Sequence, residues 1–187
     1  MALTAKRDAR MDVSEFRLWV ESRPAHERRE LPDGGPVLMA PPRERHRAIV
    51  ANLIRRIGDL ADGRGCRAMP DLGIPRAARD DFATVPDVVV RAGPPLPEGD
   101  ATDPLLVAEV LLPATMSLDR ARKIDACRTV PRLAVLPIVY SDAARVEVLR
   151  RAGDDRSVAA LGLDGTVPLP ELDGAVPVRD IYRGLAF

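Results

Sequence analysis

Two carboxylates in this sequence stand where an acidic side chain is costly. Glu109 lies within Leu105–Leu112, a segment whose remaining seven residues are all apolar. Asp87 follows Pro86 and precedes three valines. An ionised carboxylate that is buried without a partner is strongly unfavourable, so each acid needs a cation nearby or must become neutral. If the two segments are neighbouring strands, both acids can meet at one rim of the sheet. Such a pair suits a hard divalent cation, magnesium or manganese.

Each acid also has a simpler interpretation. An aspartate after a proline is a common turn residue, and Glu109 could pair with an arginine from a neighbouring helix. Taken together on consecutive strands, Asp87 and Glu109 favour a metal site over these alternatives.

Lysine is rare in the chain, which draws attention to Lys123. Among 28 basic residues only Lys6 and Lys123 are lysines, and Lys123 follows Glu109 by 14 residues. An ammonium group is a compact charge whose pKa the protein can tune, whereas a guanidinium group is not, so Lys123 is a candidate catalytic residue. The alternative is an ordinary surface salt bridge with Asp119, four residues earlier on the same predicted helix.

Helical periodicity and capping residues predict three helices that would frame these residues. Asp12 and Glu15 form a capping-box pattern at the start of the first, and apolar residues recur with a period near 3.6 along the second. Gly63 and Gly65 end the second helix, and Asp119 is the expected N-cap of the third. The predicted ranges are 12–21, 43–62 and 119–128.

Apolar runs separated by turn residues predict the strands. A hairpin is expected over 28–31 and 37–40, with its turn at Pro32-Asp33-Gly34-Gly35, and further strands over 66–72, 85–91, 105–112, 133–140 and 144–150. The run 105–112 is apolar throughout apart from Glu109, which is typical of a central strand covered on both faces. Pro137 weakens the strand 133–140, because proline in a sheet is expected only at an edge or a bulge. Shorter strands near Val158 and Val167 and a last helical turn over 180–183 complete the prediction.

The composition fits one α/β domain. The chain has 187 residues, 46% of them hydrophobic but only 3% aromatic, so its core must be aliphatic. We expect a flexible N-terminus over 1–11 and a single domain over 12–187. The 28 basic and 28 acidic residues cancel, so any site for a polyanion must be local. Two distant cysteines, no secretory signal and no membrane-spanning apolar run indicate a cytoplasmic protein that does not enter a membrane.

The order and spacing of several short segments resemble the PD-(D/E)XK nuclease superfamily and, more closely, its Uma-two family of restriction endonucleases. The resemblance covers nearly the whole chain from Val13 onward. The matching segments are Glu30-Leu31-Pro32-Asp33-Gly34, Met39-Ala40-Pro41-Pro42 with His46, Pro86-Asp87-Val88-Val89-Val90, Glu109-Val110-Leu111, Asp119-Arg120 with Lys123, Arg145-Val146-Glu147-Val148 and Ile181-Tyr182-Arg183-Gly184.

This resemblance implies a restriction-endonuclease-like fold, a central mixed β-sheet flanked by helices. It implies that Asp87 and Glu109 bind magnesium or manganese and that the protein hydrolyses phosphodiester bonds in nucleic acid, with DNA the expected substrate. The family's lysine normally stands two residues after the second acid; Leu111 fills that place and Lys123 would replace it. Glu30 matches an acidic position of the family and would act at the metal's water shell. A homodimer is expected, because related nucleases often pair to cut two strands.

Other residues matter less in this prediction. His46 matches a frequent histidine of the family, but on sequence alone a packed or surface histidine is favoured over a catalyst. Arginines on the predicted helices could contact phosphates, although each is more simply a solvated residue; they are Arg43, Arg47, Arg120 and Arg122.

The chain also departs from the family. Gly35 stands at a usual glutamate, Cys127 at a common aromatic, and Leu112 and Ala114 replace small hydroxyl residues near the expected site. These changes motivate an alternative function, in which a catalytically inactive nuclease fold serves as a nucleic-acid-binding or protein-interaction module. A nucleotide-binding enzyme is disfavoured, since no phosphate-binding glycine loop is present.

Overall fold

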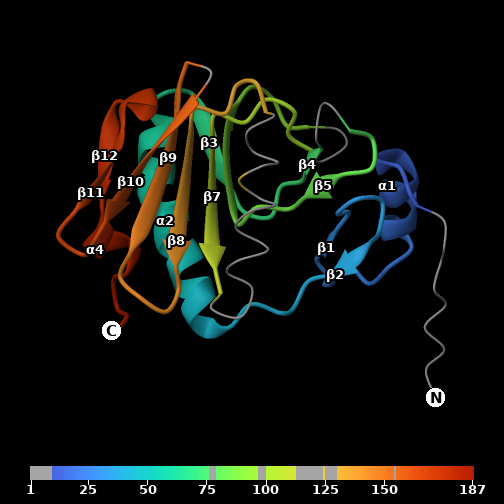
Figure 1. Cartoon of the computed structure of the whole chain (residues 1–187), viewed down its shortest axis with the longest axis horizontal. Helices are drawn as coiled ribbons and strands as arrows, with labels where there is room; N and C mark the ends of the chain where they lie inside the picture. The colour runs from blue at the N-terminus through green and yellow to red at the C-terminus, as the bar shows by residue number, and fades with distance from the viewer. Residues whose placement is uncertain (1–9, 76–78, 97–99, 113–123, 125–129, 154) are drawn as a thin grey trace.

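The centre of the protein is a six-stranded mixed sheet whose strands lie in the order β10-β9-β8-β7-β6-β3 (Figure 1). The structure is a computed structural model that describes residues 10–75, 79–96, 100–112, 124, 130–153 and 155–187. The strands are β3 (Cys66–Met69), β6 (Val88–Ala92), β7 (Leu106–Leu111), β8 (Val135–Tyr140), β9 (Val146–Ala152) and β10 (Asp155–Leu161). Only β7 and β8 run parallel; all other neighbours are antiparallel. The α/β class and the mixed sheet are as predicted.

The long helix α2 (Glu44–Asp62) covers one face of this sheet. Ile49, Leu53 and Ile57 recur at helical spacing along its buried side and pack against Val88 and Val90 of β6, among others. The same apolar cluster includes residues of the C-terminal elements, which are β11 (Thr166–Leu169), the 3-10 helix η1 (Pro170–Leu172), β12 (Gly174–Pro177) and α4 (Val178–Ile181). A second cluster covers the opposite face and contains Val89, Val107, Leu136 and Ile138. Strand β7 is therefore buried on both faces, as its apolar run predicted.

The N-terminal elements lie at the other side of the sheet, to the right in Figure 1. Helix α1 (Val13–Glu21) has the predicted capping box, in which Asp12 and Glu15 each accept a hydrogen bond from the other's backbone N–H. The predicted hairpin consists of β1 (Arg29–Glu30) and β2 (Val37–Leu38). In its turn Asp33 and Gly34 both have positive φ, the conformation that an Asp-Gly step favours. A short separate pair consists of β4 (Ile74–Pro75) and β5 (Ala83–Thr84), and a bridge between Leu31 and Ala83 connects β5 to the hairpin segment.

The prediction was wrong about Pro137. Strand β8 is not an edge strand: it lies between β7 and β9, and Pro137 is paired with Val148 of β9. On its other side, toward β7, the paired residues of β8 include Val135 and Ile138 but not Pro137. Proline lacks an N–H donor, so a gap in the ladder on one side lets it occupy a central strand.

Two further differences concern boundaries and an undescribed region. Strand β6 begins at Val88, so Asp87 stands just before the strand instead of within it, and the last helix, α4, begins two residues earlier than predicted. The predicted helix 119–128 lies outside the described residues except for Ile124, which is helical and buried. Among the described residues, no helix is long and apolar enough to span a membrane.

Candidate active site

A pocket of about 240 Å³ opens at the end of the sheet where the inner strand β7 ends and its neighbour β6 begins. The hairpin β1–β2 and the first turns of α2 form its other walls, and its polar lining residues are Arg28, Glu30, His46 and Asp87. These four residues come from three separate segments of the chain, which only the fold brings together. The pocket therefore gathers two carboxylates, one imidazole and one guanidinium group in a small space.

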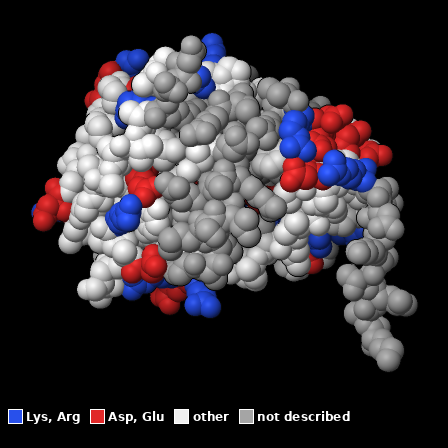
Figure 2. Space-filling view, viewed as in Figure 1, with Lys and Arg blue, Asp and Glu red and all other residues white. Residues whose placement is uncertain are grey.

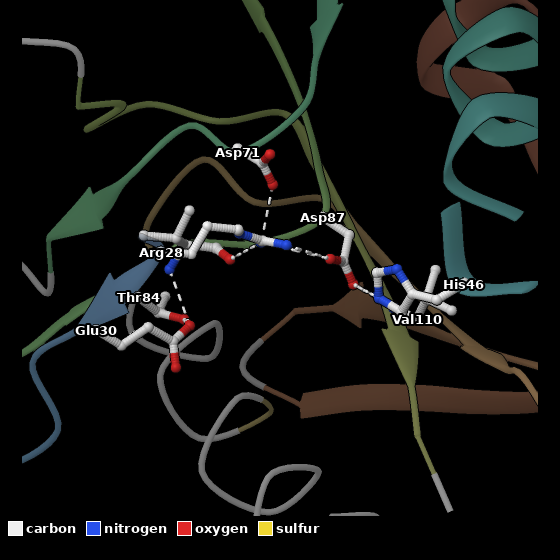
Figure 3. Close-up of polar contacts among 8 residues, drawn as sticks. Arg28, Glu30, His46, Asp71, Thr84, Asp87 and Val110 are labelled. Carbon is white, nitrogen blue, oxygen red and sulfur yellow. Dashed lines mark hydrogen bonds and ion pairs between the residues drawn. The ribbon is translucent and has the colours of Figure 1, made fainter. Parts of the chain in front are cut away.

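Asp87 is the most buried of these carboxylates, with 4% of its surface exposed. Its Oδ2 accepts a hydrogen bond from the backbone N–H of Val110 at 2.8 Å and lies 3.3 Å from Nε2 of His46. Its Oδ1 lies 3.5 Å from both terminal nitrogens of Arg28 (Figure 3). Donors on two sides thus stabilise the negative charge, which a buried carboxylate requires.

The hairpin fixes the backbone that leads to Asp87. Oε1 of Glu30 accepts hydrogen bonds from Oγ1 of Thr84 at 2.7 Å and from the backbone N–H of Val85 at 3.0 Å. On the other side of the same residue, Nη2 of Arg28 donates to the carbonyl of Val85 at 3.1 Å. Both polar groups of Val85 are therefore held by side chains of one hairpin, two residues before Asp87 (Figure 3).

Arg28 is itself held in place by a second acid. Its Nη2 lies 2.8 Å from Oδ1 of Asp71, and its side chain is only 20% exposed. Arg28 and Thr84 were not predicted as site residues. Arg28 and Glu30 are two residues apart at the start of a predicted strand and so share one face, which is the signal that could have found Arg28.

His46 is packed, as the sequence favoured, but it packs against Asp87. It is 7% exposed, and its Nδ1 is buried without a hydrogen-bond partner in the part of the chain that the structure describes. Because Nε2 faces a carboxylate, that nitrogen is the one expected to carry the hydrogen of a neutral ring. The helical spacing of His46, Ile49 and Leu53 on the core face of α2 was the signal that it points inward.

Of the other two predicted site residues, Glu109 is described by the structure and Lys123 is not. Glu109 is 1% exposed within β7, and continuing the register of the pair Val88 and Ala108 by one residue puts it opposite Asp87. Directly opposite residues of an antiparallel pair share a face of the sheet. Glu109 does not line the pocket. Lys123 lies outside the described residues, as do Arg120 and Arg122. The roles predicted for Glu109 and Lys123 stay predictions.

The carboxylates at this end of the sheet are the type of ligand that a divalent cation prefers. Within the described ranges, no group of three or more His, Cys, Asp and Glu side chains is arranged to hold an ion. Magnesium does not need such a group, since it keeps several waters and commonly binds one or two carboxylates together with substrate phosphates. Asp87 supplies carboxylate oxygens to the pocket, and Glu109 lies opposite it on the same face of the sheet by register. Asp87 already has a cationic neighbour in Arg28.

Comparison with known proteins adds the family. A family model, Uma2, described as "Putative restriction endonuclease", matches residues 13–176. The chain belongs to the Uma-two family. The match includes every site residue discussed above, from Arg28 to Lys123, and it places the protein among nucleases in general. No curated protein matches the chain.

The fold of this Uma-two protein also has a counterpart among solved structures. A crystal structure of a putative nuclease belonging to DUF820 from Anabaena variabilis ATCC 29413 superposes with a TM-score of 0.73, covering 92% of this chain and 97% of the other. The two sequences are 18% identical, so this likeness concerns the fold. It confirms the restriction-endonuclease-like architecture predicted from the sequence.

Proposed function

We propose that this Uma-two protein is a metal-dependent endonuclease that hydrolyses phosphodiester bonds, with DNA as its substrate. The observation that carries the proposal is the environment of Asp87. A buried carboxylate stands at the wall of a pocket, at the end of the central strands, beside Glu30, His46 and Arg28. A carboxylate at a pocket wall is the kind of ligand that holds the cation in metal-assisted phosphodiester hydrolysis.

The proposed roles follow from the contacts of each residue. Asp87 and Glu109 would hold the divalent cation, magnesium or manganese, which when bound polarises the scissile phosphate and acidifies a water molecule. His46 and the backbone N–H of Val110 orient Asp87 through its Oδ2. Glu30 positions the preceding backbone at Val85. Lys123 is proposed to stabilise negative charge on the phosphate during the reaction.

Two further properties belong to this proposal. A cytoplasmic location is consistent with Cys66, a buried free thiol. A homodimer would let two active sites cut two strands, as is frequent in related nucleases.

The test is a cleavage assay on single-stranded and duplex DNA and on RNA, in magnesium, manganese or EDTA. We expect wild-type protein to cleave DNA only with a divalent cation. Asp87→Asn keeps the size of the side chain and an oxygen acceptor for Val110 but removes the charge. It should lower the rate by about 100-fold or more.

The matched control is Asp164→Asn. Asp164 is 93% exposed, and its ion-pair partner Arg179 is exposed as well. This variant should cleave like wild type. Metal-independent cleavage, or equal rates for Asp87→Asn and wild type, would remove Asp87 from the active site.

A second candidate function is the catalytically inactive module, and one observation favours it. Arg28 already places a positive charge 3.5 Å from Asp87, where a catalytic cation would act. In that case the guanidinium would replace the metal permanently. Calorimetric titration with magnesium and manganese separates the two functions, because the inactive module should bind neither ion and should cleave none of the substrates.

A further inference from the structure

A second, larger pocket adjoins the candidate active site. Its volume is about 610 Å³, within the usual range for ligand pockets. Ala40, His46 and Leu112 line both pockets, so the two share a wall. A polymer whose scissile phosphate lies in the first pocket can therefore extend across this wall into the second.

The charge of the second pocket suits an anionic polymer. Arg43 and Arg45, at the start of α2, both line it, and Asp142 is the acidic side chain among its lining residues. Arg43 is exposed, and its guanidinium group makes no ion pair or hydrogen bond to any described residue; its backbone carbonyl accepts from the N–H of Arg47 within α2. An exposed, unengaged guanidinium group can bind a phosphate without first breaking a contact.

The same pocket contains an exposed aromatic ring in a chain that has few. The sequence has only six aromatic residues of the Phe, Trp and Tyr types, and Phe187, one of them, is 56% exposed. The guanidinium carbon of Arg45 lies 4.6 Å from the centre of its ring, and Tyr182 contacts it edge to face at 5.0 Å. Arg45 is in turn held by a hydrogen bond of 2.7 Å to the carbonyl of Ala186. Aromatic rings and arginine planes held in this way are the surfaces on which unpaired bases stack.

We propose that this pocket binds one unpaired nucleotide of the substrate strand, next to the scissile phosphate. Its base stacks on the Phe187 and Arg45 pair, and its phosphate contacts Arg43. The proposal rests on the nuclease function proposed above and adds a substrate preference. A base inside a duplex must first leave its stack, at a free-energy cost, so single-stranded DNA should bind more tightly than the same sequence as a duplex.

The experiment measures binding without cleavage. Fluorescence anisotropy in EDTA, with a labelled single-stranded oligodeoxynucleotide of mixed sequence and with its duplex, gives the Kd for wild type and variants. Phe187→Leu removes the ring but keeps an apolar side chain, and should weaken single-strand binding by about tenfold or more. Arg43→Gln should weaken it less and reduce the slope of log Kd against log salt concentration by about 1.

Two exposed residues away from the pocket provide matched controls. Arg67 is exposed on β3, an edge strand of the sheet, and Leu163 is 48% exposed in the loop before β11. Arg67→Gln and Leu163→Ala should bind like wild type. Thermal unfolding of each variant shows whether a change in Kd reflects loss of the fold.

The outcomes separate this proposal from the proposed function. If wild type binds DNA but Phe187→Leu and Arg43→Gln, both folded, bind equally tightly, the pocket assignment is overturned and the nuclease function is not. Tighter binding of the duplex would overturn the assignment as well. If wild type binds and cleaves no nucleic acid, both proposals fail. A dimer that dissociates in Phe187→Leu would show that a second copy of the chain occupies the pocket, which also overturns the assignment.

Discussion

At the scale of single residues, the site depends on how Asp87 and Glu30 divide their tasks. Asp87 faces the pocket with its oxygens near His46, Val110 and Arg28. Glu30 lines the same pocket, but its Oε1 is engaged by Thr84 and Val85. The two acids therefore differ: Asp87 offers charge to a ligand, whereas one oxygen of Glu30 holds the backbone that carries Asp87.

This difference gives a prediction for Glu30, which the sequence suggested as a catalytic residue. Glu30→Gln retains an oxygen that can accept from Thr84 and Val85, so it should keep the cleavage rate within a few-fold of wild type. Glu30→Ala removes the acceptor and leaves a backbone N–H without its partner, which should lower the free energy of unfolding by about 1–3 kcal/mol and reduce cleavage. Urea unfolding and the cleavage assay measure the two effects.

The same pair of variants can contradict the positioning role. If Glu30→Gln is as inactive as Glu30→Ala while its unfolding free energy equals that of wild type, the negative charge of Glu30 matters. Glu30 would then act on the cation or its waters, as the family resemblance implied.

At the scale of elements, the sequence predicted best what is encoded locally. The periodicity of α2, the capping box of α1, the Asp-Gly turn and the apolar run of β7 are all local signals, and each element formed where they indicated. The pairs β4–β5 and β11–β12 were not predicted as pairs. They contain two to four residues per strand, too few for an alternating pattern to stand out in the sequence.

The site shows the same division. Asp87 was identified because an acid before three valines is conspicuous in any sequence. Arg28 was missed, since its role arises only when the hairpin meets the residues before β6. The two-residue spacing of Arg28 and Glu30 indicates that they share a face, but it does not tell which residues that face contacts. The family resemblance could point to Glu30 and His46 but not to the atoms they contact.

Tyr182 illustrates a family segment with a structural task. It follows α4, is 2% exposed, and its hydroxyl lies 2.8 Å from the carbonyl of Tyr140 and 2.5 Å from that of Arg145. The hydroxyl also accepts a hydrogen bond from the N–H of Arg145 at 3.2 Å. It thus ties the C-terminal elements to the turn between β8 and β9. Tyr182→Phe should lower the free energy of unfolding by about 1–2 kcal/mol at neutral pH.

The effect of Tyr182 should also depend on pH. Burial raises the pKa of its hydroxyl, so the folded state keeps the proton at a pH where the unfolded chain, with a tyrosine pKa near 10, has lost it. The contribution is complete below about pH 10 and declines as pH rises above that value. Urea unfolding at pH 7 and at higher pH should therefore show a steeper alkaline loss in wild type than in Tyr182→Phe. Equal losses would show that Tyr182 does not ionise on unfolding.

At the scale of the whole molecule, the charge distribution bears on how nucleic acid would be attracted, and the packing bears on whether the chain unfolds as one unit. The net charge is zero, and the charged side chains visible in Figure 2 include both signs, with acidic ones gathered near α1, β4 and β5. Attraction of nucleic acid must therefore be local, as the two arginines beside the second pocket would provide. Residues of the sheet belong to two large apolar clusters, one on each face. A small separate cluster is formed by Met11, Phe16, Leu31 and Ala83.

Whether the small cluster unfolds with the sheet can be tested because the only tryptophan lies beside it. Trp19 of α1 packs against this cluster, so its fluorescence reports the N-terminal elements, while far-ultraviolet circular dichroism reports mainly the sheet and α2. The contacts of Glu30 and Arg28 with Val85, and of Arg28 with Asp87 just before β6, link the two parts. We expect both signals to change at the same urea concentration, which is the criterion for one cooperative domain.

A core variant sharpens this test. Leu31 is fully buried, so Leu31→Ala should lower the free energy of unfolding by about 2–5 kcal/mol and move both transitions together. The exposed control Leu163→Ala should change the free energy of unfolding by no more than about 0.5 kcal/mol. If the fluorescence transition of Leu31→Ala instead precedes the circular dichroism transition, the hairpin and α1 unfold as a separate unit. The hairpin could then detach from the backbone before Asp87 while the sheet stays folded, and the active site would be assembled only when that unit is docked.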